Sequence, residues 1–208
     1  MKRNPKIYII DVTNRDGVQT SRICLSKLQK TMINIYLNQM GVFQSEFGFP
    51  VTRHETNYLN ANLELAKLGA VSPIRLSGWI RATKEDVKNA FKLVPGIKHM
   101  NLSISTSDQM IIHKFQGKLD HGSVIKEMGN AVKEAHSLGL ESIAVNAEDA
   151  SRTNLEYLKE FSLAAAQAGA DRIRDCETLG VDTPFTIYER RKILAETVKK
   201  PIEIHCHK

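Results

Sequence analysis

The residues best suited to chemistry lie near the two ends of the chain. Arg15 and Asp16 are adjacent in a polar turn, and His205 and His207 are separated by one residue. In a strand, residues two apart leave the same face, so both imidazoles would point one way and Cys206 the other. Two nitrogens and a carboxylate oxygen suit Mg²⁺, Mn²⁺, Fe²⁺, Co²⁺ or Zn²⁺. The spacing predicts a metal site formed by Asp16, His205 and His207, with packed or solvated histidines as the alternative.

Arg15 is a permanent cation beside the predicted metal ligand. It would repel the metal ion unless anions lay between them. A 2-oxo acid supplies such anions, because its carboxylate and keto oxygen can chelate the metal. The guanidinium could then stabilise an alkoxide that forms when a carbon nucleophile attacks. The alternative is a surface pair of Arg15 and Asp16 without catalytic meaning.

Short apolar runs recur along the chain, and each is followed by a polar turn and a segment with helical spacing. This alternation predicts a βα repeat with seven strands. The predicted strands are Ile7 to Val12, Val42 to Phe47, Ile74 to Ile80, Met100 to Ser105, Ser142 to Asn146, Arg172 to Cys176 and Ile202 to His207.

The helical segments carry start and stop signals. Ser26 is placed to cap a helix, and Thr83 opens a capping box with Asp in the usual Glu position. Gly69, Gly139 and Gly169 stand where three helices should end.

A closed β/α barrel is favoured over an open doubly wound sheet. The first turn, residues 11–17, has one glycine and lacks the glycine-rich phosphate loop of the open fold. A barrel needs about 250 residues, and this chain has 208. We therefore expect residues 1–208 to form one catalytic (β/α)8 TIM barrel with about seven of its eight units, the eighth unit and any C-terminal subdomain being absent.

Composition sets broad limits. The chain is 42% hydrophobic and has a net charge of +6, with the basic residues spread among acidic ones. This pattern indicates solvated helix faces rather than a nucleic-acid surface. The start does not resemble a secretory signal, no stretch could span a membrane, and three scattered cysteines suit a cytoplasmic protein. Met32 and Tyr36, at helical spacing, are expected in the core.

Active sites of such barrels are built from the loops after the strands. The unusual polar residues of this chain occupy those loops. They are Asn14 to Gly17, Glu46 to Pro50, Arg81, Ser105 to Asp108, Glu148 to Thr153, Glu177 to Gly180, and His205 to His207.

Four of these elements together resemble a metal-dependent barrel family that includes isopropylmalate, homocitrate and citramalate synthases and hydroxymethylglutaryl-CoA lyase. Asp11 to Gln19 reads D-V-T-N-R-D-G-V-Q, similar to the family's opening signature. Glu46 to Pro50 resembles its Glu-x-Gly-Phe-Pro element, and Asn146 to Thr153 its Glu-Asp-Ala-Ser-Arg-Thr element. The His-x-His element closes the chain. Among the branches of this family, the sequence of these motifs most resembles that of the Re-citrate and homocitrate synthases.

The resemblance implies a role for each matching residue. Asp16, His205 and His207 would bind a divalent metal, with Mg²⁺, Mn²⁺ or Co²⁺ expected and Zn²⁺ as an alternative. Arg15 would stabilise the oxyanion, and Glu148 would lie near the acetyl methyl group as a base or as the orienter of one. The residues expected to contact substrate are Gln19, Glu46, Arg81, Arg152, Arg174 and Thr178.

Departures from the family's pattern bear on the substrate. Asn14 stands where Leu is common, Glu177 replaces an Asp, and Lys208 stands where Asn often follows the second histidine. Arg174 occupies a position that is short and neutral in isopropylmalate synthases, so it could meet a second substrate carboxylate. The alternative is an internal salt bridge with Glu177, Asp175 or Glu203.

The resemblance implies a Claisen condensation of acetyl-CoA with a 2-oxo acid, expected to be dicarboxylic. Oxaloacetate would give citrate, and 2-oxoglutarate would give homocitrate. The expected partners are these small molecules and a second copy of the chain, with no nucleic acid and no membrane. The alternatives are an isopropylmalate or citramalate synthase, a lyase that cleaves a hydroxyacyl-CoA, and a non-enzymatic basic binding module.

Overall fold

The computed structural model describes residues 6–207. The basic start at residues 1–5 and the Lys208 departure lie outside these residues. The chain divides into two compact units: the first comprises Met1–Trp79 with Ala90–His99, and the second comprises Ile80–Asn89 with Met100–Lys208.

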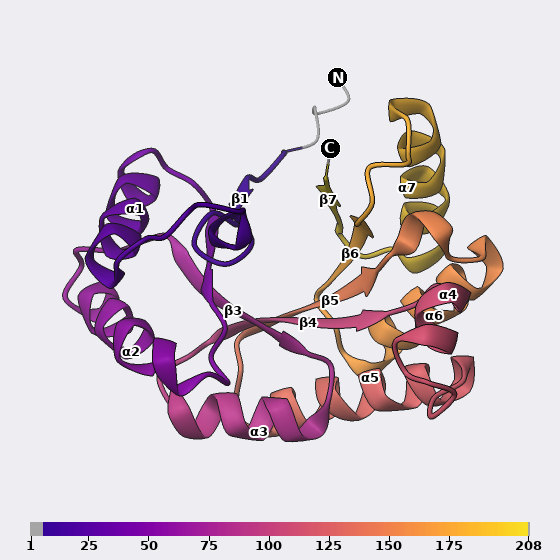
Figure 1. Ribbon diagram of the computed structural model, residues 1–208, viewed down its shortest axis with the longest axis horizontal. Coiled ribbons are helices and arrows are strands. Elements are labelled where there is room, and N and C mark those ends of the chain that lie inside the picture. Colours follow the sequence, from indigo (N-terminus) through magenta and orange to yellow (C-terminus); the bar gives the residue numbers. More distant parts are fainter. Residues whose placement is uncertain (1–5, 208) are drawn as a thin grey trace. The chain divides into compact units, whose positions relative to one another are not determined.

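Seven strands form one sheet in the order of their sequence, β1-β2-β3-β4-β5-β6-β7 (Figure 1). The pairs β1 with β2, β2 with β3, β5 with β6 and β6 with β7 are parallel. A doubly wound sheet reverses its strand order at a switch point, and this sheet has no reversal. The predicted fold class is confirmed: the chain is an α/β fold that covers about seven βα units of a TIM barrel.

All seven predicted strands are present, with shifted ends. β1 is much shorter than predicted, and β5 continues two residues further. The strands are β1 (Ile10–Asp11), β2 (Gln44–Gly48), β3 (Arg75–Arg81), β4 (His99–Ser105), β5 (Ser142–Glu148), β6 (Arg172–Glu177) and β7 (Ile202–Cys206).

The first unit contains the 3-10 turn η1 (Gly17–Gln19) and the helices α1 (Lys27–Gln39) and α2 (Arg53–Lys67). Its helix α1 buries two polar residues, Lys30 and Asn34. Leu28, Met32 and Tyr36 of the helix are exposed, whereas Ile33, Ile35 and Leu37 are half-buried. The expectation that Met32 and Tyr36 lie in the core was wrong, because the inward face of α1 meets polar partners.

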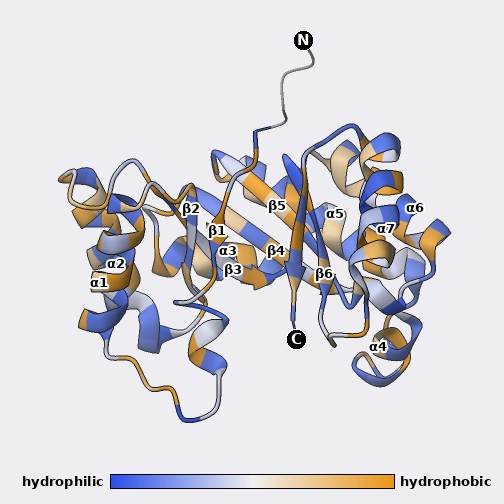
Figure 2. Cartoon of the chain, turned by 90° about the horizontal axis from the view of Figure 1, so that it is seen from above, coloured by the Kyte–Doolittle hydropathy of each residue, from blue (hydrophilic) through white to orange (hydrophobic). Residues whose placement is uncertain are grey.

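The second unit has a larger apolar core. Helix α5 (His121–Ser137) buries Val124, Met128 and Val132, and helix α6 (Leu155–Ala168) runs beside it, with both hydrophobic and hydrophilic bands along its length (Figure 2). The remaining elements are α3 (Lys84–Leu93), which spans the unit boundary, α4 (Asp108–His113), η2 (Ala150–Arg152) and α7 (Pro184–Val198). Helix α4 was not predicted, because the polar loop after β4 gives it no apolar period.

The predicted helix signals are found with one change. Ser26 forms a full capping box with Gln29. Thr83 accepts a hydrogen bond from the Asp86 N–H, but the Asp86 carboxylate binds Arg81 rather than closing the box. The three glycines expected at helix ends all have positive φ: Gly69, Gly139 and Gly169.

Within residues 6–207, no helix combines the length and the apolar character that crossing a bilayer requires. The three cysteines are free thiols: Cys24, Cys176 and Cys206.

Gly169→Ala is expected to lower the free energy of unfolding by about 1–3 kcal/mol. Gly169 has φ +113°, and an added Cβ would lie 2.5 Å from His136 Nε2. Gly129→Ala, in the interior of α5 with nothing within 4 Å of its Cβ position, should instead stabilise by about 0.5–1 kcal/mol. Urea denaturation of both variants measures this, and equal effects would contradict the strain at Gly169.

Candidate functional site

In the first unit, the polar turn after β1 is folded around one backbone carbonyl. The Val12 oxygen accepts the N–H groups of Arg15, Asp16 and Gly17, at 3.1, 2.8 and 3.1 Å. The Asp11 carboxylate accepts the N–H and hydroxyl of Thr13, at 2.9 and 3.0 Å. Local hydrogen bonds within the Asp-x-Thr-x-Arg-Asp-Gly sequence therefore fix the turn that presents Arg15 and Asp16.

The Arg15 guanidinium is held by three neighbours in the first unit. Its Nε donates to Glu46 Oε2 at 3.0 Å, and its Nη1 donates to Asp16 Oδ1 at 3.0 Å. The guanidinium carbon lies 4.7 Å from the ring centre of Trp79. Two carboxylates and an aromatic face fix the cation's orientation, which suits a group that must meet developing negative charge.

Asn14 anchors the same turn to a buried polar ladder. Its Nδ2 donates to the Lys30 carbonyl and to Asn34 Oδ1, both at 2.9 Å. Asn34 in turn donates to the Tyr58 hydroxyl at 3.0 Å and to Asn62 Oδ1 at 2.9 Å. The departure from Leu at position 14 is thus explained by a hydrogen-bonded network between the turn, α1 and α2.

The loop after β2 is fixed by Glu55 of α2. This carboxylate accepts the Phe49 N–H at 2.7 Å and pairs with the buried ammonium of Lys30. An added Cβ at Gly48 would lie 2.6 Å from Glu55 Oε2. The glycine of the Glu-Phe-Gly-Phe-Pro sequence is required because the carboxylate passes this close to the backbone.

In the second unit, the two histidines point to the same side, as their spacing predicts. His205 Nε2 and His207 Nε2 are 2.9 Å apart, and the ring planes are inclined by 72°. Two nitrogens bound at right angles to one metal with bonds of about 2.1 Å would be separated by about 3 Å. The pair therefore has the spacing of two neighbouring ligands of one ion.

Strand register aligns functional residues in rows on one face of the second unit's sheet. Glu148 is paired with Cys176, and Cys176 with His205. Paired residues of parallel strands share a face, and two strand spacings separate the Glu148 and His205 backbones by about 10 Å. Glu148 and His205 thus face the same side of the sheet at the ends of β5 and β7.

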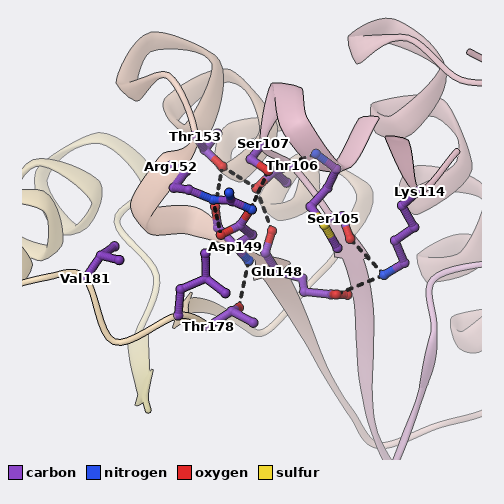
Figure 3. A network of polar contacts seen from close by, with 12 residues as sticks. Ser105, Thr106, Ser107, Lys114, Glu148, Asp149, Arg152, Thr153, Thr178 and Val181 are labelled. Carbon is purple, nitrogen blue, oxygen red and sulfur yellow. Dashed lines mark hydrogen bonds and ion pairs between the residues drawn. The ribbon is translucent and has the colours of Figure 1, made fainter. Parts of the chain in front are cut away.

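Asp149 connects the loops after β4, β5 and β6 (Figure 3). Its carboxylate is buried and accepts hydrogen bonds from Ser107 and from Arg152, whose Nε lies 3.0 Å from both oxygens. Its N–H donates to Thr178 Oγ1 at 3.0 Å, and its backbone is left-handed, with φ 64°. One residue therefore positions Arg152 and Thr178, both predicted substrate contacts.

Glu148, the predicted base, is held by a lysine. Lys114 Nζ lies 2.9 Å from Glu148 Oε1 and 2.9 Å from Ser105 Oγ (Figure 3). The Glu148 carbonyl accepts the N–H of Thr106 at 3.0 Å. Both the backbone and the side chain of Glu148 are therefore attached to the end of β4.

Arg174 is 2% exposed and pairs with a carboxylate of the protein. Its Nε donates to Glu203 Oε2 at 2.8 Å, and Arg172 binds the other oxygen of Glu203. The sequence left two roles open for Arg174, a substrate contact or an internal salt bridge. The structure contains the salt bridge, with Glu203. The role of Arg174 toward a second substrate carboxylate remains a prediction.

The loop after β6 is organised by Glu177. Its carboxylate accepts the N–H groups of Leu179, Gly180 and Val181, at 3.3, 2.8 and 3.0 Å. Glu177 thus supports the loop that carries Thr178. The longer side chain, where the family has Asp, reaches three amides of its own turn.

On the other face of β6, a buried ion-pair cluster attaches α7. Arg190 binds both Asp175, at 2.8 Å, and Asp182. Burial raises the pKa of the Asp175 carboxyl, although the Arg190 guanidinium opposes the shift. Burial would also raise the pKa of Asp182, but hydrogen bonds from Arg190 and Thr186 outweigh it and lower this pKa.

Two other predicted substrate contacts are Gln19, in the first unit, and Arg81, in the second. Arg81 binds Asp86 through two hydrogen bonds of 2.7 Å, which raise the pKa of its guanidinium. Gln19 is exposed in η1. Their roles, the role of Glu46 and the joining of Asp16 with His205 and His207 around one ion stay predictions.

Sequence reasoning missed Asp149 and Lys114. Asp149 lies within a motif that was singled out, and an acidic residue after a strand followed by Arg at i+3 could have indicated its ion pair. Lys114 gave no signal, because α4 itself was not predicted.

These features define the class of protein. The sequence-ordered parallel strands, with polar residues gathered at the strand ends, are those of a β/α-barrel protein. The HMGL-like family model matches residues 6–208, and the chain belongs to this family.

Curated relatives share extensive sequence identity. Citrate (Re)-synthase of Dehalococcoides mccartyi (strain CBDB1) is 61% identical over 202 residues, covering 97% of this chain and 49% of the relative. 2-Isopropylmalate synthase 2 of Caldanaerobacter subterraneus subsp. tengcongensis is 38% identical over 206 residues, covering 99% and 51%. The chain spans about half the length of the curated relatives it matches.

A solved structure shares the fold at low identity. Hydroxymethylglutaryl-CoA lyase from Pseudomonas aeruginosa superposes with a TM-score of 0.77 at 13% identity, covering 97% of this chain and 68% of the lyase. This similarity supports the fold alone.

Glu203→Gln is expected to lower the free energy of unfolding by about 3 kcal/mol or more, because the buried Arg174 and the half-buried Arg172 would lose the carboxylate they share. Glu156→Gln, which alters an exposed pair with Lys159, should cost less than about 1 kcal/mol. Denaturant titration of both variants measures the difference. Similar losses would show that the Glu203 pairs behave like surface pairs.

Proposed function

We propose that the protein to which this chain belongs condenses acetyl-CoA with a 2-oxo acid, and that oxaloacetate is the preferred acceptor, giving citrate. The observation that carries the proposal is the 61% identity to a citrate (Re)-synthase across nearly the whole chain. The site geometry of each unit is compatible with this chemistry. The proposal includes the expected homodimer and cytoplasmic location.

The proposed metal site comprises Asp16, His205 and His207. The donor set fits a divalent cation, since it offers one carboxylate and two imidazoles whose nitrogens have the spacing of adjacent ligands. Mg²⁺, Mn²⁺ and Co²⁺ are the favoured ions, with Zn²⁺ as the alternative. When bound, such an ion would act as a Lewis acid toward the keto oxygen of the 2-oxo acid.

The chain's own residues supply the remaining functions. Glu148 takes a proton from the acetyl methyl group, which makes that carbon a nucleophile. Arg15, oriented by Glu46 and Asp16, stabilises the negative charge that develops on the keto oxygen during attack. Thr178, held by the Asp149 N–H, donates its hydroxyl hydrogen to the carboxylate of the 2-oxo acid.

The main alternatives use the same site with other acceptors or in the reverse direction. 2-Oxoglutarate would give homocitrate, and monocarboxylic acceptors would give isopropylmalate or citramalate. A lyase of the hydroxymethylglutaryl-CoA type has the weaker support, because the similarity to that solved structure is at 13% identity.

A thiol-release assay with acetyl-CoA tests the proposed function directly. The full-length protein is supplied with oxaloacetate, 2-oxoglutarate, pyruvate or 2-oxoisovalerate in the presence of Mn²⁺. We expect the highest kcat/KM with oxaloacetate. Release with none of the four acids would refute the condensation, and a preference for a monocarboxylic acid would refute the acceptor.

Two adjacent substitutions separate the metal ligand from the oxyanion stabiliser. Asp16→Ala is expected to remove bound metal, measured by elemental analysis after dialysis. Arg15→Ala should keep the metal and lower kcat by about 10² to 10³, the scale of losing an oxyanion donor. Metal retained by Asp16→Ala, or turnover within about tenfold of wild type for Arg15→Ala, would contradict the respective role.

A further inference from the structure

Lys114 places a cation beside the predicted base at the ends of β4 and β5. It follows α4 directly, and its ammonium lies between Glu148 Oε1 and Ser105 Oγ at 2.9 Å from each (Figure 3). The Lys114 side chain is 44% exposed and that of Glu148 is 22% exposed. Both groups are therefore attached to the strand ends and remain open to a ligand.

The hydrogen bonds of Lys114 and Glu148 leave one donor and one acceptor available to a ligand. An ammonium group has three N–H donors, and Lys114 uses two of them. Lys114 binds Oε1 of Glu148. Within residues 6–207, the other carboxylate oxygen, Oε2, accepts no hydrogen bond. Glu148 thus keeps one carboxylate oxygen, and Lys114 keeps one N–H, that can hydrogen-bond to a ligand, and the two side chains are already in contact.

We propose that Lys114 is a catalytic residue that stabilises the enolate oxygen of acetyl-CoA while Glu148 removes the methyl proton. This inference rests on the proposed function and assigns the enolisation half-step to two named groups. Glu148 Oε2 takes the proton, and the electron pair of the broken C–H bond forms the carbon–carbon double bond of the enolate. The negative charge moves to the thioester oxygen, which accepts the third N–H of Lys114.

The geometry favours this role because the methyl carbon and the carbonyl oxygen are bonded to the same carbon atom. The base and the oxyanion donor must then be neighbours, as Lys114 and Glu148 are. Ser105 holds the ammonium in place before substrate binds, so little reorganisation is needed when charge develops. A simple surface ion pair that secures α4 is the competing explanation, and it predicts small effects on turnover.

Methyl proton exchange isolates this half-step from the condensation. The full-length protein with Mn²⁺ is incubated with acetyl-CoA in D₂O without any 2-oxo acid, and deuterium incorporation is followed by NMR. For Lys114→Met we expect exchange and kcat to fall together by about 10² to 10³. The KM for the 2-oxo acid and the metal content should not change.

Three further variants control the experiment. Lys118→Met, an exposed lysine of the same segment, should match wild type in exchange and turnover. Ser105→Ala keeps the cation and should lose up to about tenfold, the scale of one hydrogen bond. Lys114→Arg keeps the charge and should recover part of the exchange rate, which also shows that the segment remains folded.

Two outcomes would overturn the inference. One is exchange by Lys114→Met within about threefold of wild type, and the other is reduced turnover with unchanged exchange. Because exchange is measured without the acceptor acid, it separates the two proposals. A wild type that exchanges methyl protons but condenses none of the acids tested would refute the proposed condensation and leave the role of Lys114 standing.

Discussion

The buried carboxylate of Asp149 is the interaction on which the site of the second unit depends. Its side chain binds Ser107 and Arg152, and its backbone N–H binds Thr178. A buried anion is costly unless it is neutralised and hydrogen-bonded, so the three loops are held together by the requirement to satisfy this one group. Asp149 itself has a left-handed backbone, with φ 64°.

The first unit uses neutral groups for the same purpose. Asn14, Asn34 and Asn62 form a fully buried ladder that joins the turn after β1 to α1 and α2. Helix α1 consequently buries Lys30 and Asn34 and leaves Leu28, Met32 and Tyr36 exposed. Positioning Arg15 and Asp16 is therefore linked to a core in which hydrogen-bond geometry, rather than apolar packing, determines how the turn and the helices fit together.

The sequence was sufficient to predict the repeating strands and helices, because the spacing of apolar residues that identifies each of them is a local property. It also identified the loops that carry polar residues. It could not decide how Arg174 is used, since both a substrate and Glu203 satisfy a buried cation, and the outcome depends on register between β6 and β7. It did not find Lys114, because that side chain reaches Glu148 from just after α4, a short helix that was not predicted. Long-range side-chain choices of this kind are set by tertiary structure.

The Glu177 side chain has a consequence for how this loop can vary. Its carboxylate closes a ring over the turn by accepting the amides of Leu179, Gly180 and Val181. Inserting or deleting a residue there would break the ring, and shortening the acid would leave amides unmatched. Loop length and the identity of residue 177 should thus be inherited together, which makes this segment a poor place to graft new specificity one residue at a time.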